Sequence, residues 1–186
     1  GLAGLTLAEF LKAYADVTLF EKSRGVGGRM STRYAEQYQF DHGAQYFTAR
    51  SKAFKQFLKP FIDDGLVQPW QPRVLTLGDD KKPYKRDWFE PHFVAAPKMN
   101  HLGKALAEDK KLQSNTQISD LINTANGWLL RDTAGVEYGC FDWVVSTAPS
   151  PQAANLLPNI FDGYAEITNA EMVGCYCLML GVSESP

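Results

Sequence analysis

The chain has 186 residues, 45% hydrophobic and 22% charged, a composition that excludes a disordered or low-complexity protein. Nineteen basic and twenty-one acidic residues give a formal charge of -2, which excludes nucleic-acid binding through broad phosphate neutralisation. No apolar run approaches the roughly 18 residues of a membrane span, and no basic region precedes an apolar signal segment. We therefore expect a cytoplasmic protein with no membrane partner.

The first elements read as half of a βαβ unit. A helix is predicted over residues 2–14 from apolar residues at helical spacing, which are Leu7, Phe10, Leu11 and Tyr14. The run "VTLF", residues 17–20, has almost no polar alternation, which is typical of a strand buried in a parallel sheet. A strand before Gly1 would complete the unit.

The middle of the chain departs from the βαβ pattern. A second helix begins after Ser51 and stops at Gly65, with an apolar stripe that contains Phe54, Phe57 and Leu58. From residue 67 to residue 84, prolines and lysines break short segments, which predicts antiparallel strands and turns.

The remaining elements alternate between helices and strands. We expect a hairpin turn at Asn126-Gly127. Helices are predicted over 99–110 and 149–157, and strands over 116–123, 127–132, 136–141, 143–149 and 173–182. This order predicts an α/β fold with two interleaved lobes and no flexible linker.

The chain opens on a glycine pair at a helix start. Gly1, Leu2, Ala3 and Gly4 match the last part of GxGxxG, in which bare backbone and the helix N-terminus hold a pyrophosphate. The alternative is a close helix–strand contact. Glu21 follows at the end of the next strand, near the interval expected for an acid that binds a ribose. An acid at this position favours a ribose without a 2′-phosphate.

A glycine-arginine segment follows that acid. Gly25, Gly27 and Gly28 permit close approach or positive φ, while Arg24, Arg29 and Arg33 supply planar charged donors. The residues alone indicate an anion site or a solvated loop.

The order "GLAGL…VTLFEKSRGVGGRMSTR…FDHGAQYFTAR" resembles the flavin-containing amine oxidases, most closely their renalase-like bacterial NAD(P)/FAD-dependent branch. The resemblance extends to "WVVSTAPSPQAANLL" and implies an FAD cofactor. It implies a ribose acid at Glu21 and further FAD contacts at Lys22, Gly27, Gly28, Arg29, Gly43, Ala44, Gln45, Ile118 and Ala148. No catalytic residue is assigned; His42 is a candidate base, and the alternative is a flavin oxidation of an electron-rich substrate without a protein base.

The resemblance also predicts the organisation of the lobes. Residues 1–50 and 98–150 would form a Rossmann-like FAD-binding lobe, and residues 51–97 and 151–186 part of an antiparallel-sheet α+β substrate lobe. The family's first strand and its C-terminal FAD segment have no counterpart here, so we expect a fragment that is inactive alone. Aromatic residues of the second lobe are candidates for a substrate cavity or for core: Trp70, Tyr84, Trp88 and Phe89.

These observations favour an FAD-dependent oxidoreductase that moves a hydride from a small substrate to flavin, with dioxygen as electron acceptor. The resemblance implies dihydronicotinamide isomers or amines as substrates. Two alternatives stay open: an NAD-dependent dehydrogenase, because NAD uses the same fingerprint, and a non-catalytic nucleotide-binding or interaction fragment. Cys140, Cys175 and Cys177 lack zinc-ligand spacing, so we expect no metal. The oligomeric state is left open.

Overall fold

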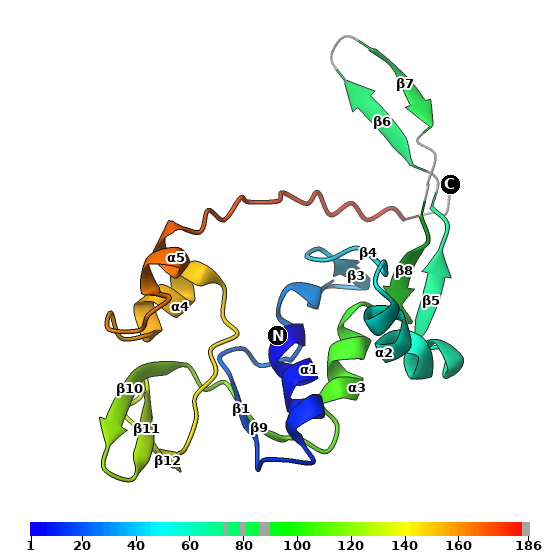
Figure 1. Cartoon of the computed structure of the whole chain (residues 1–186). Coiled ribbons are helices and arrows are strands. Elements are labelled where there is room, and N and C mark those ends of the chain that lie inside the picture. The colour runs from blue at the N-terminus through cyan, green and yellow to red at the C-terminus, as the bar shows by residue number, and fades with distance from the viewer. Residues whose placement is uncertain (73, 79–80, 86–89, 184–186) are drawn as a thin grey trace. The chain divides into compact units, whose positions relative to one another are not determined.

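The computed structural model describes residues 1–72, 74–78, 81–85 and 90–183 (Figure 1). It has a mixed α/β architecture, as predicted, and divides into two compact units, Gly1–Arg29 with Gly103–Pro186 and Met30–Leu102. The elements are α1 (Leu2–Leu11), β1 (Thr18–Glu21), η1 (Gly28–Met30), β2 (Thr32–Ala35), β3 (Tyr38–Asp41), β4 (Phe47–Thr48), α2 (Lys52–Asp63), β5 (Val67–Trp70), β6 (Leu75–Gly78), β7 (Lys81–Lys85), β8 (His92–Ala95), α3 (Asn100–Ala107), β9 (Lys111–Ser114), β10 (Ile118–Thr124), β11 (Gly127–Asp132), β12 (Glu137–Phe141), α4 (Ser150–Leu156) and α5 (Tyr164–Asn169).

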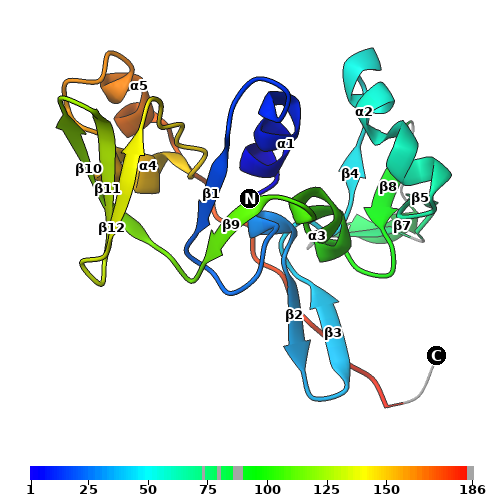
Figure 2. The same ribbon diagram turned by 90° about the horizontal axis from the view of Figure 1, so that it is seen from below.

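The first unit contains a parallel pair of strands beside α1. β1 pairs with β9 from Thr18 opposite Lys111 to Glu21 opposite Ser114, and the two strands run together in Figure 2. Helix α1 packs on β1 and buries Leu5 and Ala8, so its buried face is not the predicted stripe: Leu7 and Leu11 are half-buried, and Phe10 is 63% exposed. The helix ends at Leu11, earlier than predicted, and Tyr14 is 87% exposed.

The same unit contains an antiparallel sheet, β10-β11-β12. The predicted hairpin is confirmed, but Thr124 pairs with Gly127, so the two turn residues are Ala125 and Asn126. Gly127 opens β11 with a φ of 112°, which a side chain would disfavour. From β1, Phe20 meets the rings of Tyr138 and Phe141 edge-on, at centroid distances of 5.1 and 5.9 Å. These contacts join the two sheets of the unit.

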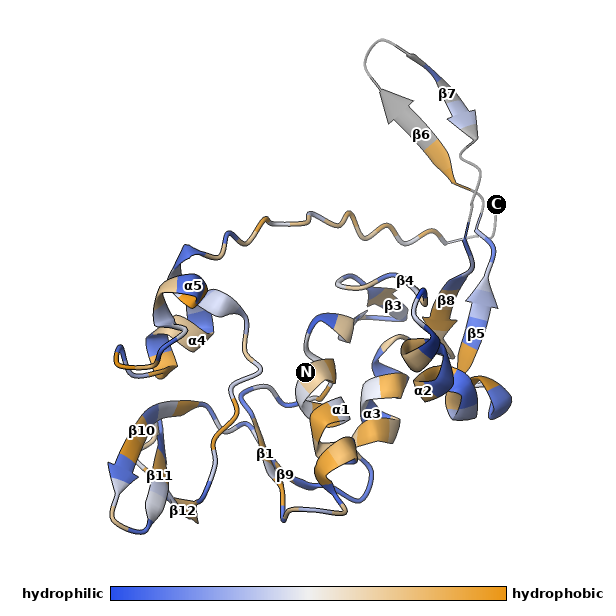
Figure 3. Ribbon diagram, in the orientation of Figure 1, coloured by the Kyte–Doolittle hydropathy of each residue, from blue (hydrophilic) through white to orange (hydrophobic). Residues whose placement is uncertain are grey.

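The second unit is built from short antiparallel strands and α2. Strands β4 and β5 flank β8, and β6 pairs with β7, as predicted for residues 67–84. The Ser51 hydroxyl accepts a hydrogen bond from the Phe54 N–H at 3.1 Å, so the predicted helix start is confirmed. Figure 3 shows hydrophobic and hydrophilic residues along α2, whose Leu58 is fully buried. The longest helix, α2, has 12 residues, and no helix within the described ranges could span a membrane.

Two predicted strands are wrong. Residues 143–149 and 173–182 have no regular secondary structure, and neither pairs with a strand of the described chain. Both sequences are apolar, yet Trp143 is 86% exposed and Tyr176 is 100% exposed. Their composition favours a strand, but a strand also requires a hydrogen-bonded neighbour, which the composition does not reveal.

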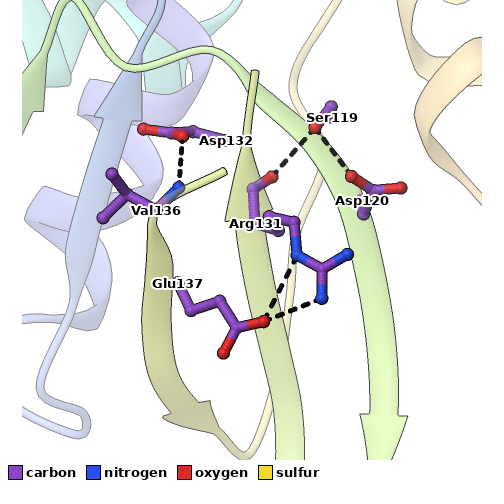
Figure 4. Close-up of polar contacts among 6 residues, drawn as sticks. All are labelled: Ser119, Asp120, Arg131, Asp132, Val136 and Glu137. Carbon is purple, nitrogen blue, oxygen red and sulfur yellow. Dashed lines mark hydrogen bonds and ion pairs between the residues drawn. The ribbon is translucent and has the colours of Figure 1, made fainter. Parts of the chain in front are cut away.

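A buried aspartate holds the turn between β11 and β12 (Figure 4). The Asp132 carboxylate accepts hydrogen bonds from the N–H groups of Ala134 and Val136, both at 2.9 Å, and from the Tyr138 hydroxyl at 3.0 Å. Burial raises the pKa of Asp132, but these hydrogen bonds outweigh it, led by that of Val136, and the net pKa lies below its ordinary value. Nearby, the Arg131 guanidinium donates to Glu137 at 2.7 Å.

We expect Leu58→Ala to destabilise the protein by about 2–5 kcal/mol, because truncation leaves a cavity in a fully buried position. Urea unfolding followed by circular dichroism measures the change. Leu178→Ala is the matched control, since Leu178 is 89% exposed. Equal effects of the two variants would contradict the burial of Leu58.

We expect Asp132→Asn to lower stability at pH 7, with a difference from the wild type that shrinks in acid. A carboxyl whose pKa is lower in the folded state stabilises the fold above its unfolded pKa of about 4, and the effect is lost as pH falls through the folded pKa. Urea midpoints between pH 7 and pH 3 measure this. Asp162→Asn, at an exposed site, is the control; a pH-independent difference would contradict the assignment.

Candidate functional site

Glu21 lies at the carboxyl end of β1, where its side chain is held in one orientation. Its backbone oxygen accepts a hydrogen bond from the Thr116 N–H at 3.0 Å, just beyond the end of β9. Its side chain is 13% exposed, and Oε1 accepts from the Ser23 N–H at 3.0 Å. The Gly1 nitrogen lies 3.3 Å from Oε2. The structure therefore brings the predicted ribose acid to the start of the predicted glycine loop.

The start of α1 combines helix N–H groups with a tight packing contact. No side chain caps the helix at Gly1, and the first N–H groups of a helix have no partner within it. A Cβ on Gly4 would lie 2.9 Å from the Thr147 hydroxyl oxygen and 3.9 Å from a Leu19 methyl carbon. Gly4 thus packs closely against Thr147, which lies outside the strands, and makes an ordinary van der Waals contact with β1 through Leu19.

The glycines of the segment after Glu21 differ in their surroundings. Gly27 and Gly28 have φ values of 110° and 55°, a region that favours glycine. A Cβ on Gly28 would lie 3.0 Å from the Cα of Gly1, whereas a Cβ on Gly25 would meet nothing within 4 Å. The structure therefore requires glycine at residues 27 and 28 and leaves residue 25 unconstrained. The side chains of Arg24, Arg29 and Arg33 are exposed.

Three further predicted residues lie in the first unit. The Lys22 ammonium donates to the Gln152 amide oxygen at 3.1 Å, which connects the end of β1 to α4. Ile118 opens β10, two residues after the Thr116 that binds the Glu21 backbone. Ala148 is exposed and follows Thr147, which touches Gly4. Through these chain neighbours, all three belong to the surroundings of Glu21 and α1.

The other predicted residues lie in the second unit, on the connection from β3 to β4. His42 and Ala44 are half-buried, while Gly43 and Gln45 are exposed. The connection starts at Asp41, whose carboxylate accepts hydrogen bonds from the Thr32 hydroxyl at 2.5 Å and the Met99 N–H at 3.1 Å. Asp41 therefore anchors this connection to the residue before α3, a role that sequence reasoning missed. Because the Met99 contact spans 58 residues, no local signal reveals it.

Of the predicted aromatic candidates, Trp70 stacks on Tyr46 with ring centroids 5.3 Å apart. Tyr46 also contacts the ring of His92 at 4.7 Å, and neither Tyr46 nor His92 was singled out in the sequence. Tyr84 is 55% exposed. Trp88 and Phe89 lie outside the described residues. Among the described residues, no three His, Cys, Asp or Glu side chains are grouped to hold a metal ion.

Residues 1–61 match the family of NAD(P)-binding Rossmann-like domains. The match spans α1, β1, Glu21 and the Gly27-Gly28 segment, the region where the structure forms its glycine contacts. This Rossmann-like region indicates a dinucleotide cofactor and an oxidoreductase-type function.

We expect Gly28→Val to weaken dinucleotide binding at least about tenfold, because a branched side chain at positive φ is strained and its Cβ would press on the Cα of Gly1. Titration of the purified full-length protein with FAD and with NAD⁺ measures the loss. Gly25→Val, in open space, should cost much less. Similar losses in both variants would show that the contact with Gly1 does not matter.

Proposed function

We propose that the protein is an FAD-dependent oxidoreductase similar to the flavin-containing amine oxidases of the renalase-like branch. One observation carries the proposal: the Gly27-Gly28-Arg29 segment begins six residues after the predicted ribose acid, and its backbone at Gly28 packs against the start of α1. In the resembled family the matching doublet and arginine lie along the FAD. The left-handed φ of both glycines supports a segment shaped for close approach rather than a loose loop.

The residues present fit the adenosine diphosphate half of FAD. The start of α1 offers N–H donors and a positive dipole end to a pyrophosphate. Glu21 is oriented by the Ser23 N–H, so its carboxylate can accept hydrogen bonds from ribose hydroxyls. Bare backbone at Gly28 leaves no side chain between the segment and Gly1. The arrangement therefore binds a dinucleotide by backbone donors at the phosphates and a carboxylate at the ribose.

FAD held by these residues would supply hydride chemistry: the substrate would lose a hydride, and dioxygen would take up the two electrons with two protons to give hydrogen peroxide. The chain's own residues orient the cofactor: Glu21 through the ribose and Arg29 as a charged donor beside it. We further propose that the connection Gly43–Gln45 approaches the flavin ring. His42 remains a candidate base at this connection, and no proton transfer is assigned to it.

The proposed substrate is a small molecule, a dihydronicotinamide isomer or an amine, as the resemblance implies. In this proposal residues 1–50 and 98–150 bind FAD, while residues 51–97 and 151–186 contribute to the substrate lobe. The ring cluster of Tyr46, Trp70 and His92 belongs to the compact unit Met30–Leu102 and offers planar surfaces to a ring-shaped substrate.

A second candidate function is an NAD-dependent dehydrogenase, because the matching family is described as NAD(P)-binding. The absorption spectrum of the purified full-length protein separates the two. We expect the yellow colour and visible absorption of a bound flavin, with FAD released on denaturation. A colourless protein that binds NAD⁺ and not FAD would overturn the flavoenzyme proposal.

We expect Glu21→Ala to weaken FAD binding by about tenfold to a hundredfold, because hydrogen bonds to a charged acceptor contribute about 1.5–3 kcal/mol. Quenching of flavin fluorescence on titration measures the affinity. Glu137→Ala, which removes a carboxylate from β12 in the same unit, is the control. An unchanged FAD affinity in Glu21→Ala would remove Glu21 from the cofactor site.

A further inference from the structure

Helix α3 contains a buried glycine against the backbone of the glycine-arginine segment. A Cβ on Gly103 would lie 2.9 Å from the Cα of Gly27, 3.3 Å from its nitrogen and 3.7 Å from the carbonyl carbon of Val26. Real Cβ atoms essentially never approach other atoms within 3.0 Å, and these neighbours are backbone atoms that cannot rotate away. Glycine is also less favourable than alanine inside a helix. The close contact with Gly27 therefore accounts for glycine at this position.

The segment is held from a second direction as well. Gly28, the next residue, approaches Gly1 at the start of α1, where an added Cβ would lie 3.0 Å from the Gly1 Cα. Residues 27 and 28 thus contact two helices through backbone alone. Both have positive φ, so the segment has a defined shape and little room to shift.

An ion pair connects α1 to the turn that follows α3. The Lys110 ammonium lies 2.6 Å from Glu9 Oε2, and the Lys110 side chain is only 13% exposed. Hydrogen bonding to Lys110, and then to Lys12, lowers the pKa of Glu9, so this carboxyl is charged at neutral pH. Helix α3 also buries Leu102, just before Gly103 in the sequence, and Leu106, between Gly103 and this turn. The position of α3 beside Gly27 is therefore fixed by packing and by charge.

We propose that Gly103 is a positioning residue for the dinucleotide: its bare backbone sets the place of Gly27 and Gly28, which in the proposed function lie along the pyrophosphate. This inference rests on the proposed function. A methyl group at residue 103 would push the segment away from α3, toward Gly1. The backbone N–H groups of this segment would move, while Glu21, held by Ser23 and Thr116, would stay in place.

We expect a selective loss of ligand affinity. Gly103→Ala should weaken ligands that carry the pyrophosphate and spare adenosine, which offers only the base and the ribose to Glu21. A merely structural role of Gly103 would lower the affinity for both kinds of ligand equally. The comparison of FAD with adenosine therefore separates positioning from general destabilisation.

The test measures FAD and adenosine affinities of the full-length wild type, Gly103→Ala and the control Gly139→Ala, whose added Cβ meets nothing within 4 Å. Gly103→Ala should lose at least about tenfold in FAD affinity, given the usual cost of overpacking, with adenosine affinity within about twofold of the wild type. Gly139→Ala should bind both as the wild type does. Unchanged FAD affinity, or an equal loss for both ligands, would overturn the inference.

A second variant covers the case in which Gly103→Ala does not fold. Lys110→Met removes the ion pair with Glu9 and adds no atom near Gly27. It should loosen α3 and lower FAD affinity more than adenosine affinity; equal effects would contradict the positioning role. Failure of the wild type itself to bind FAD would instead overturn the proposed function, and with it this inference.

Discussion

The candidate site depends on the close approach of backbone at Gly27 and Gly28. Added Cβ atoms would lie 2.9 Å (Gly103) from the Gly27 Cα and 3.0 Å (Gly28) from the Gly1 Cα. Only glycine permits both of these close contacts and the positive φ values of residues 27 and 28. The arrangement brings the starts of α1 and η1 together at the end of β1. Without these contacts the segment would be one more exposed loop after a strand.

The charged groups around this backbone arrangement determine which kind of ligand it can bind. Parallel pairing of β1 with β9 places Glu21 and Ser114 at the same edge of the sheet, where ligands bind in Rossmann-like folds. The Glu21 carboxylate supplies an acceptor for hydroxyl groups, whereas the helix start and Arg29 favour negative charge. An acceptor beside a positive region matches a nucleotide, which carries ribose hydroxyls and phosphates a short distance apart. The family match over residues 1–61 also indicates a dinucleotide ligand.

Local signals predicted the elements that local chemistry determines. Ser51 and Gly65 predicted the bounds of α2, and Asn126-Gly127 predicted the hairpin to within one residue. The β2–β3 hairpin was missed because its turn uses Glu36 at a φ of 51°, with no glycine or asparagine as a signal. The strands predicted at residues 143–149 and 173–182 were wrong because an apolar pattern does not specify a pairing partner. In the candidate site, motif spacing predicted Glu21 and the family resemblance predicted Gly28, whereas the contacts of Asp41 and Gly103 join residues far apart in the sequence.

Hydrogen exchange of backbone amides, with and without FAD, tests the central claim most directly. A dinucleotide bound at the Gly1–Gly4 and Gly27–Arg29 backbone should slow exchange in peptides that cover these two stretches. Peptides from the β10–β11 hairpin turn, Ala125–Asn126, should exchange at the same rate in both states. Protection confined to other parts of the protein, or absent from residues 27–29, would contradict the account.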